Sequence, residues 1–89
     1  AFVLTNVPSG STSFTVKILQ DSTGGHSVGI DTFKNTSGTS IPVYWPGGGT
    51  LPIVTTTADR EDIYSFKTFD GDNITSAGLY GVVGGQNFA

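Results

Sequence analysis

Few residues of this chain have side chains suited to catalysis or metal binding. His26 is the only histidine, and cysteine is absent. A histidine that acts as a general base or a metal ligand needs a carboxylate or further ligands beside it. His26 follows Gly24 and Gly25 in a stretch typical of a turn. We therefore expect a solvated loop histidine, and we predict that the chain is not an enzyme and carries no cofactor.

Two acidic groups are the candidates for cation binding. Asp70, Asp72 and Asn73 could offer hard oxygen ligands to calcium, but their loop lacks the length and the late bidentate glutamate of an EF-hand. Asp and Asn in such a turn also bond their own backbone, and we favour this interpretation. The second group, within 59–62, is expected to cap nearby amides or to form a salt-bridged surface. A structural calcium site requires the two groups to meet in space; otherwise we predict no metal.

Aromatic side chains are the candidates for contact with a ligand or a partner. Tyr44, Trp45 and Tyr80 could stack against sugars, or they could fill a small core or meet a neighbouring subunit, where their large area contributes most. We favour the core or an interface. Phe88, in the glycine-rich last segment of the chain, is a further candidate contact residue.

Short alternating segments predict the elements that would position these side chains. Thr12–Leu19 gives the clearest strand signal, because Phe14, Val16 and Ile18 alternate with polar residues. We expect further strands at 2–6, 28–33, 41–45, 53–57, 63–69 and 79–83, with turns between them and no helix of useful length. This spacing predicts one all-β domain over residues 1–89, a small antiparallel β-sandwich or barrel (jelly-roll-like) of about six to eight short strands. The expected core consists of Phe14, Val16, Ile18, Tyr64, Phe66 and Val82.

The composition excludes some functions. The net charge is −3 and the four positive residues are scattered, so the chain has no basic face for a nucleic acid. No apolar run approaches the roughly 20 residues that span a bilayer, and we expect no membrane insertion. Glycine, serine and threonine make up 35 of the 89 residues, which predicts a hydroxyl-rich surface. Because the chain begins with Ala1 rather than Met, we expect a processed chain or part of a longer one.

The second half of the chain carries an ordered set of motifs. They are a Trp-Pro-Gly-Gly corner (45–48), Pro52, an Asp-Ile-Tyr-Ser-Phe strand (62–66), Asp70-Gly71, Tyr80-Gly81 and a Gly-Gln-Asn-Phe segment (85–88). This order resembles a small β module of tailed-phage virion proteins, mainly tail-fibre-like and other structural proteins of cyanophages. The resemblance covers residues 41–89, with a looser fit at 14–19. The chain departs from the pattern where Asp72-Asn73 replaces a second glycine and where residues 74–78 are inserted.

The resemblance implies a non-enzymatic structural protein on the outer surface of a virion. As a tail or fibre appendage it would be a trimer, and as a capsid decoration protein it would load onto heads. In either case it would assemble with copies of itself or with other virion proteins, and a small β domain without disulfides gains stability by assembling. The alternative function is a carbohydrate- or receptor-binding module that contacts host-surface glycans through Tyr44, Trp45 and Tyr80.

Overall fold

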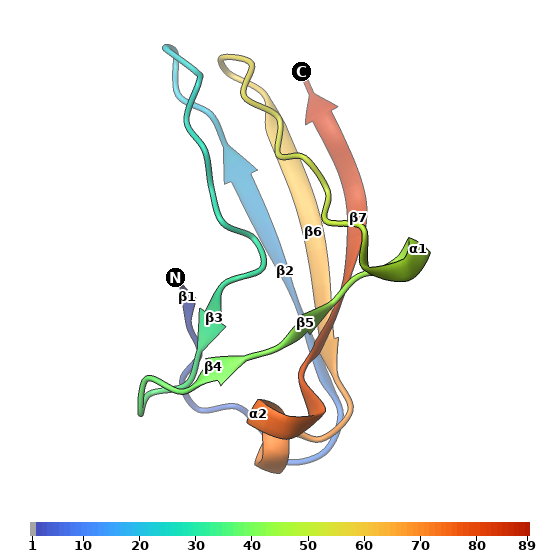
Figure 1. Cartoon of the computed structure of the whole chain (residues 1–89). Coiled ribbons are helices and arrows are strands. Elements are labelled where there is room, and N and C mark those ends of the chain that lie inside the picture. The colour runs from blue at the N-terminus through green and yellow to red at the C-terminus, as the bar shows by residue number, and fades with distance from the viewer. Residues whose placement is uncertain (1) are drawn as a thin grey trace.

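The computed structural model describes residues 2–89 and is rich in β-structure, with 39% of residues in strands and 12% in helices. The strands form two sheets (Figure 1). The smaller sheet has the order β1-β3-β4, and the larger, curled sheet has the order β2-β6-β7-β5. The elements are β1 (Phe2–Val3), β2 (Thr12–Leu19), β3 (Phe33–Lys34), β4 (Ser40–Ile41), β5 (Val43–Tyr44), α1 (Pro46–Gly49), β6 (Glu61–Thr68), η1 (Gly71–Asn73), α2 (Ile74–Ala77) and β7 (Leu79–Phe88).

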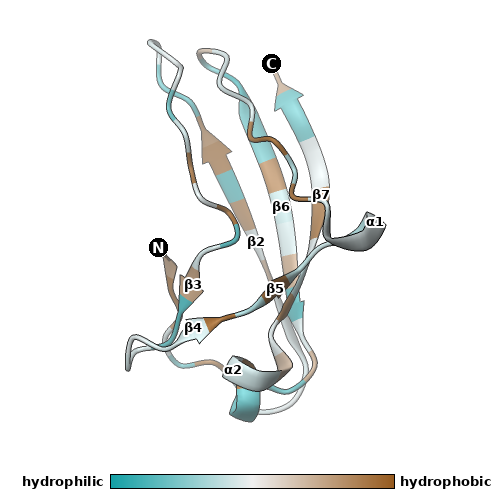
Figure 2. Ribbon diagram, viewed as in Figure 1, coloured by the Kyte–Doolittle hydropathy of each residue, from teal (hydrophilic) through white to brown (hydrophobic). Residues whose placement is uncertain are grey.

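Three long strands form the body of the larger sheet. β2 and β6 pair antiparallel without interruption from Thr12↔Thr68 to Leu19↔Glu61, and β7 pairs antiparallel with the other side of β6. Burial alternates from residue to residue along β2 and β6, and apolar residues alternate with polar ones most clearly at 14–18 of β2 (Figure 2). This period of two places one set of side chains against the core and the other set on the outer face. The strands expected at 12–19, 63–69 and 79–83 are therefore confirmed, and β7 extends further than expected.

The purely antiparallel arrangement is wrong. β1 pairs with β3, and β5 pairs with β7, in parallel. The strand expected at 41–45 is divided between β4 and β5 by Pro42, which cannot donate a ladder hydrogen bond. The segments at 28–33 and 53–57 are largely irregular: Val28, Ile30 and Val54 pack against the core without joining a ladder. α1 is a turn rather than a true helix, since Gly47 and Gly48 have φ values of 71° and 78°.

The core lies on the concave face of the larger sheet, under the smaller sheet. Phe66 is at its centre, with ring centroids 4.9 Å from Phe33, 5.4 Å from Phe14 and 5.6 Å from Trp45. The buried apolar residues are Ile18, Ile30, Phe33, Ile41, Trp45, Tyr64, Phe66, Ile74 and Leu79. The expectation that Val82 is a core residue is wrong: it lies opposite Ser65, whose side chain points to the outer face, and it is 50% exposed.

No helix among residues 2–89 is long and apolar enough to cross a membrane.

Gly81 allows Trp45 to reach the core. A Cβ atom on Gly81 would lie 2.6 Å from the indole ring of Trp45, closer than any real contact of this kind. We expect Gly81→Ala to reduce the free energy of unfolding by about 1–3 kcal/mol, because overpacking a filled core forces its neighbours to move. Urea unfolding measures this change. The matched control is Gly29→Ala, whose Cβ would meet only the side-chain hydroxyl of exposed Thr32. Equal losses in both variants would contradict the packing argument.

Candidate functional site: the outer face of the larger sheet

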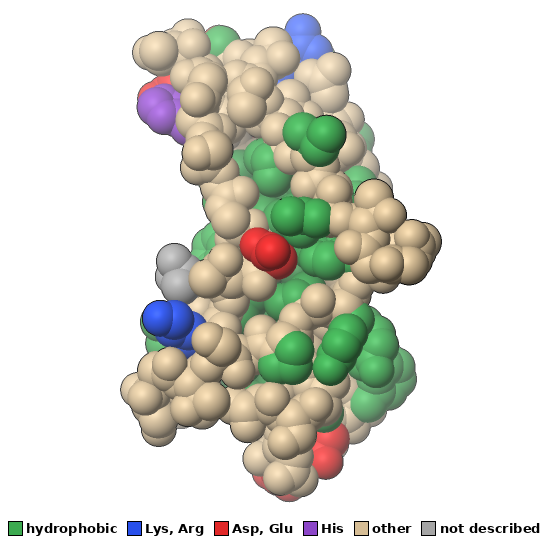
Figure 3. Space-filling view, in the orientation of Figure 1, with side chains coloured by type: hydrophobic (Ala, Val, Ile, Leu, Met, Phe, Trp, Pro, Cys, Tyr) green, Lys and Arg blue, Asp and Glu red, His purple; other side chains and the backbone are tan. Residues whose placement is uncertain are grey.

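The outer face of the larger sheet carries an exposed apolar strip made of Tyr44, Phe69, Tyr80 and Val82. Tyr44 and Tyr80 are direct partners in the parallel β5–β7 pair, and their ring centroids are 5.3 Å apart. Phe69, just beyond the end of β6, meets Tyr80 edge-on at 5.4 Å. Between 46% and 58% of each residue is exposed. Figure 3 shows hydrophobic side chains gathered where β5 and β7 meet. We call these four residues the outer strip.

Two shallow hollows flank Tyr80 and Val82. One is lined by Ser13, Ser65, Phe66, Lys67, Phe69, Tyr80 and Val82, and the other by Tyr44, Trp45, Pro46, Tyr80, Gly81 and Val82. The ammonium of Lys67 lies 4.9 Å from the ring centroid of Phe69, so this charge already has an aromatic partner in the chain. No carboxylate or side-chain amide lines either hollow. The strip therefore offers apolar area and few directional hydrogen-bonding groups.

The structure separates the four aromatic residues named from the sequence. Tyr44 and Tyr80 lie side by side on the outer strip. Trp45 is 8% exposed and packs against Phe66, and its buried indole N–H has no hydrogen-bond partner among residues 2–89. Phe88 lies far along β7, opposite Glu61, and is 44% exposed. Only two of the four thus belong to the outer strip.

Phe69 and Val82 were not identified from the sequence as parts of this surface. The position of Phe69 could have been predicted, because side chains alternate between the two faces along β6. Ser65 and Lys67 point outward, so Phe69, two residues further on, lies on the same side. Which face of the sheet Val82 occupies is set by the pairing register between β7 and β6, and a single sequence does not give this register.

A buried carboxylate, Asp62, joins the strands at the end of β6 that lies away from the outer strip. Asp62, on the concave face of β6, is 1% exposed. It accepts hydrogen bonds from the amides of Thr55 (2.7 Å) and Asn87 (2.9 Å) and from the hydroxyl of Tyr64 (2.7 Å). The side-chain amide of Gln86 donates to Asp62 at 3.3 Å and to the Tyr64 hydroxyl at 2.8 Å. The network joins β6, β7 and the 51–57 segment.

The protonation of this network follows from its hydrogen bonds. Burial alone would raise the pKa of Asp62, but the amides of Thr55 and Asn87 and the hydroxyl of Tyr64 outweigh it and lower the pKa to about 2. Burial, together with the neighbouring carboxylate, raises the pKa of Tyr64 to about 12. Asp62 is therefore ionised and Tyr64 neutral at neutral pH. The expectation that a carboxylate of the 59–62 group caps nearby amides is confirmed at this residue.

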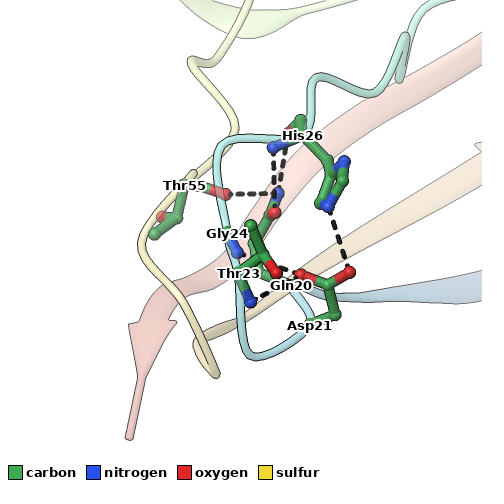
Figure 4. Close-up of polar contacts among 6 residues, drawn as sticks. All are labelled: Gln20, Asp21, Thr23, Gly24, His26 and Thr55. Atoms are coloured by element: carbon green, nitrogen blue, oxygen red, sulfur yellow. Dashed lines mark hydrogen bonds and ion pairs between the residues drawn. The ribbon is translucent and has the colours of Figure 1, made fainter.

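His26 lies in a second polar cluster at the loop after β2 (Figure 4). Its ring Nε2 is 3.1 Å from Asp21 Oδ2, with both side chains well exposed. The amides of Gly24 and Thr23 donate to the Asp21 carboxylate and lower its pKa. The side chain of Gln20 is buried. Its amide nitrogen donates to the carbonyls of His26 and, at 3.1 Å, of Thr55, and its amide oxygen accepts from the backbone N–H of His26. The solvated loop histidine is confirmed.

Residues 25–29 spell Gly-His-Ser-Val-Gly, the spacing of a nucleophile elbow, and our expectation from the sequence that no such pattern is present was wrong. An elbow requires a strand that enters a sharp turn and a helix that leaves it. Here the segment is an exposed, irregular loop between β2 and β3, and no helix follows it before β3. No hydrogen bond joins Ser27 to His26 among residues 2–89. The pattern has no catalytic geometry.

The two acidic groups do not meet. Asp62 and Asp70 lie toward opposite ends of β6. The side-chain amide of Asn73 donates to the Asp70 carboxylate at 3.1 Å, so Asp70 and Asn73 form a turn closed by their own side chains. Within residues 2–89, no three His, Asp or Glu side chains gather closely enough to hold a metal ion.

Comparisons of the chain with protein families, with curated proteins and with solved structures found no match.

Acid should weaken the fold through Asp62. The pKa of Asp62 falls from 3.8 to about 2 on folding, and this shift corresponds to about 2–3 kcal/mol of stability. This contribution is complete above a pH of about 4 and is lost as the pH falls towards 2, because the unfolded chain takes up the proton first. Urea unfolding between pH 5 and pH 2 measures it. The Asp62→Asn variant should have a lower free energy of unfolding at neutral pH, and this free energy should depend much less on pH. The control Asp72→Asn, at an exposed site, should keep the original free energy of unfolding and its pH dependence. A full acid transition in Asp62→Asn would show that other carboxylates cause it.

Proposed function

We propose that this chain is a non-enzymatic structural β module that assembles with copies of itself or with neighbouring proteins. The observation that carries this proposal is the outer strip, which presents three aromatic residues and a valine on one face of a sheet. Contiguous exposed apolar surface on a small domain is typical of interaction sites. Tyr and Phe are also enriched at protein interfaces, where their large area is buried at low entropic cost.

A protein partner fits the outer strip better than a sugar does. Sugar recognition combines an aromatic platform with polar groups that fix orientation. The rings here pack against one another, at interplanar angles of 36° for Tyr44–Tyr80 and 76° for Phe69–Tyr80, so they do not form a flat platform. The hollows beside them lack carboxylates and side-chain amides. Glycan binding is the competing outcome of the test below.

The setting that we propose is the outer surface of a tailed-phage virion, as a tail or fibre domain or as a capsid decoration protein. It rests on the resemblance of residues 41–89 to cyanophage structural modules. The separate motifs that carry this resemblance lie in contact: Trp45 packs over Gly81, and Asp62 bonds the backbone of Asn87. These motifs, separate in the sequence, thus lie together in the structure. We also propose that the two sheets form an open, sandwich-like arrangement, in which the smaller sheet covers part of the concave face.

Removing aromatic area from the outer strip should weaken assembly. We expect the purified chain to be oligomeric by light scattering, and Tyr80→Ser and Phe69→Ser each to weaken self-association by about tenfold or more, since burying such a side chain is worth about 1.5–3 kcal/mol. The matched control is Ile53→Ser, which removes a side chain that is 88% exposed and lies outside the strip. Circular dichroism verifies that each variant is folded.

The same samples decide between the two functions. Binding to bare phage heads or tails that is lost in Tyr80→Ser supports the virion role. A chain that stays monomeric at all concentrations and binds no virion component overturns the assembly proposal. A glycan-array signal that Tyr80→Ser abolishes would then favour the host-surface alternative.

A further inference from the structure

The larger sheet has two strand edges that no strand among residues 2–89 covers. β2 pairs with β6 alone. β7 pairs with β6 on one side and, on the other, with β5 only at Leu79 and Tyr80. Pro46, which follows β5, lies beside Gly81 and Val82, so the uncovered edge of β7 begins near Val83. Figure 1 shows β2 and β7 on opposite sides of β6.

These edges carry only part of the usual protection against pairing with another chain. Natural sheets guard their edges with charges, prolines or bulges. β7 contains no charged residue and no proline, and its pairing with β6 shifts register at two points. β2 carries one charge, Lys17, which is 3.8 Å from Glu61 of the neighbouring strand. The bulges bend the edge of β7, and the charge of Lys17 on β2 is paired with Glu61 of its own sheet, so neither edge carries an unpaired charge.

The strands at the two edges run in the same direction, and their ends lie at the same level along the strand direction. β2 and β7 both run antiparallel to β6, so they run in the same direction. Leu19 and Phe88 are both partners of Glu61, which places them at one level on either side of β6. A rotation about an axis parallel to the strands preserves direction and level. It would therefore bring β2 of one copy beside β7 of the next copy.

The side chains at this level complement each other. Residues directly opposite in a sheet share a face, so Leu19, Glu61 and Phe88 all lie on the outer face. Leu19 is 59% exposed and Phe88 is 44% exposed. Each is an apolar side chain on a strand with an uncovered edge, and the ring of Phe88 lies over Gly85 of its own strand. The one charged residue of β2, Lys17, is on the same face two residues before Leu19 and is paired with Glu61. Contact between copies would shield both side chains from water.

We propose that copies of this chain join edge to edge, with β2 of one copy beside β7 of the next and Leu19 against Phe88 of the next copy. The contact is heterologous, since it uses two different surfaces, and it gives a closed ring or a filament according to the rotation between copies. This inference rests on the proposed assembly function and specifies its geometry. The outer strip lies on the same face of the sheet, toward the opposite ends of the strands.

Disulfide crosslinking tests the contact, because the chain has no cysteine of its own. Leu19→Cys and Phe88→Cys are made singly and together in the full chain, oxidised mildly and analysed on non-reducing gels. We expect neither single variant to crosslink alone, an equal mixture of the two to give dimers, and the double variant to give a ladder or closed multimers. Dilution below the association range should abolish the products.

Glu61→Cys is the matched control, since it lies at the same level and on the same face but on the central strand. Dimers of Glu61→Cys would indicate face-to-face stacking, and dimers of Phe88→Cys alone would indicate pairing of two β7 edges; either result overturns the edge inference. An oligomeric mass without crosslinks in the mixture also overturns it and leaves the assembly function standing. A monomeric mass without any crosslink overturns both.

Discussion

The buried carboxylate of Asp62 is the constraint on which the larger sheet depends. A charge with 1% exposure is tolerated only where hydrogen bonds replace water, and four donors from three segments do so here. These donors fix the positions of Tyr64 and Gln86 and of the backbone at Asn87. Asn87 has a φ of 60°, and its amide points into the carboxylate at the bulged end of β7. The path of the uncovered edge is thus set from the interior of the fold.

The same carboxylate explains how an irregular segment covers the sheet. Residues 51–57 belong to no strand, yet Asp62 accepts from the Thr55 amide and Gln20 donates to the Thr55 carbonyl. The side chains of Asp62 and Gln20 therefore provide hydrogen bonds for the amide and carbonyl of Thr55, which would otherwise need a partner strand. Gln86 donates in addition to the carbonyl of Ile53 at 2.6 Å. A buried polar network replaces a strand pair in this part of the molecule.

Sequence periodicity was sufficient for the long strands and insufficient for their surroundings. β2 was predictable because residues 14–18 alternate between apolar and polar, and β6 because it is rich in aromatic and branched residues between turn signals. The strands expected at 28–33 and 53–57 had apolar residues but lacked a partner, and pairing partners are set by tertiary contacts. Of the candidate site, Tyr44 and Tyr80 were named. Trp45 was assigned to the same surface, but strand alternation places adjacent residues on opposite faces.

That alternation places Tyr44, the last residue of β5, and Trp45, which follows it, on opposite faces of the sheet. Tyr44 and Trp45 are neighbours in the chain, so one must point outward when the other packs inward. Gly81 leaves the space that the indole of Trp45 occupies beside Phe66. With the largest side chain used in the core, Tyr44 is left on the outer face beside Tyr80. The exposed strip is thus a consequence of how the core is filled. Covering it requires a surface that the chain, over residues 2–89, does not itself supply.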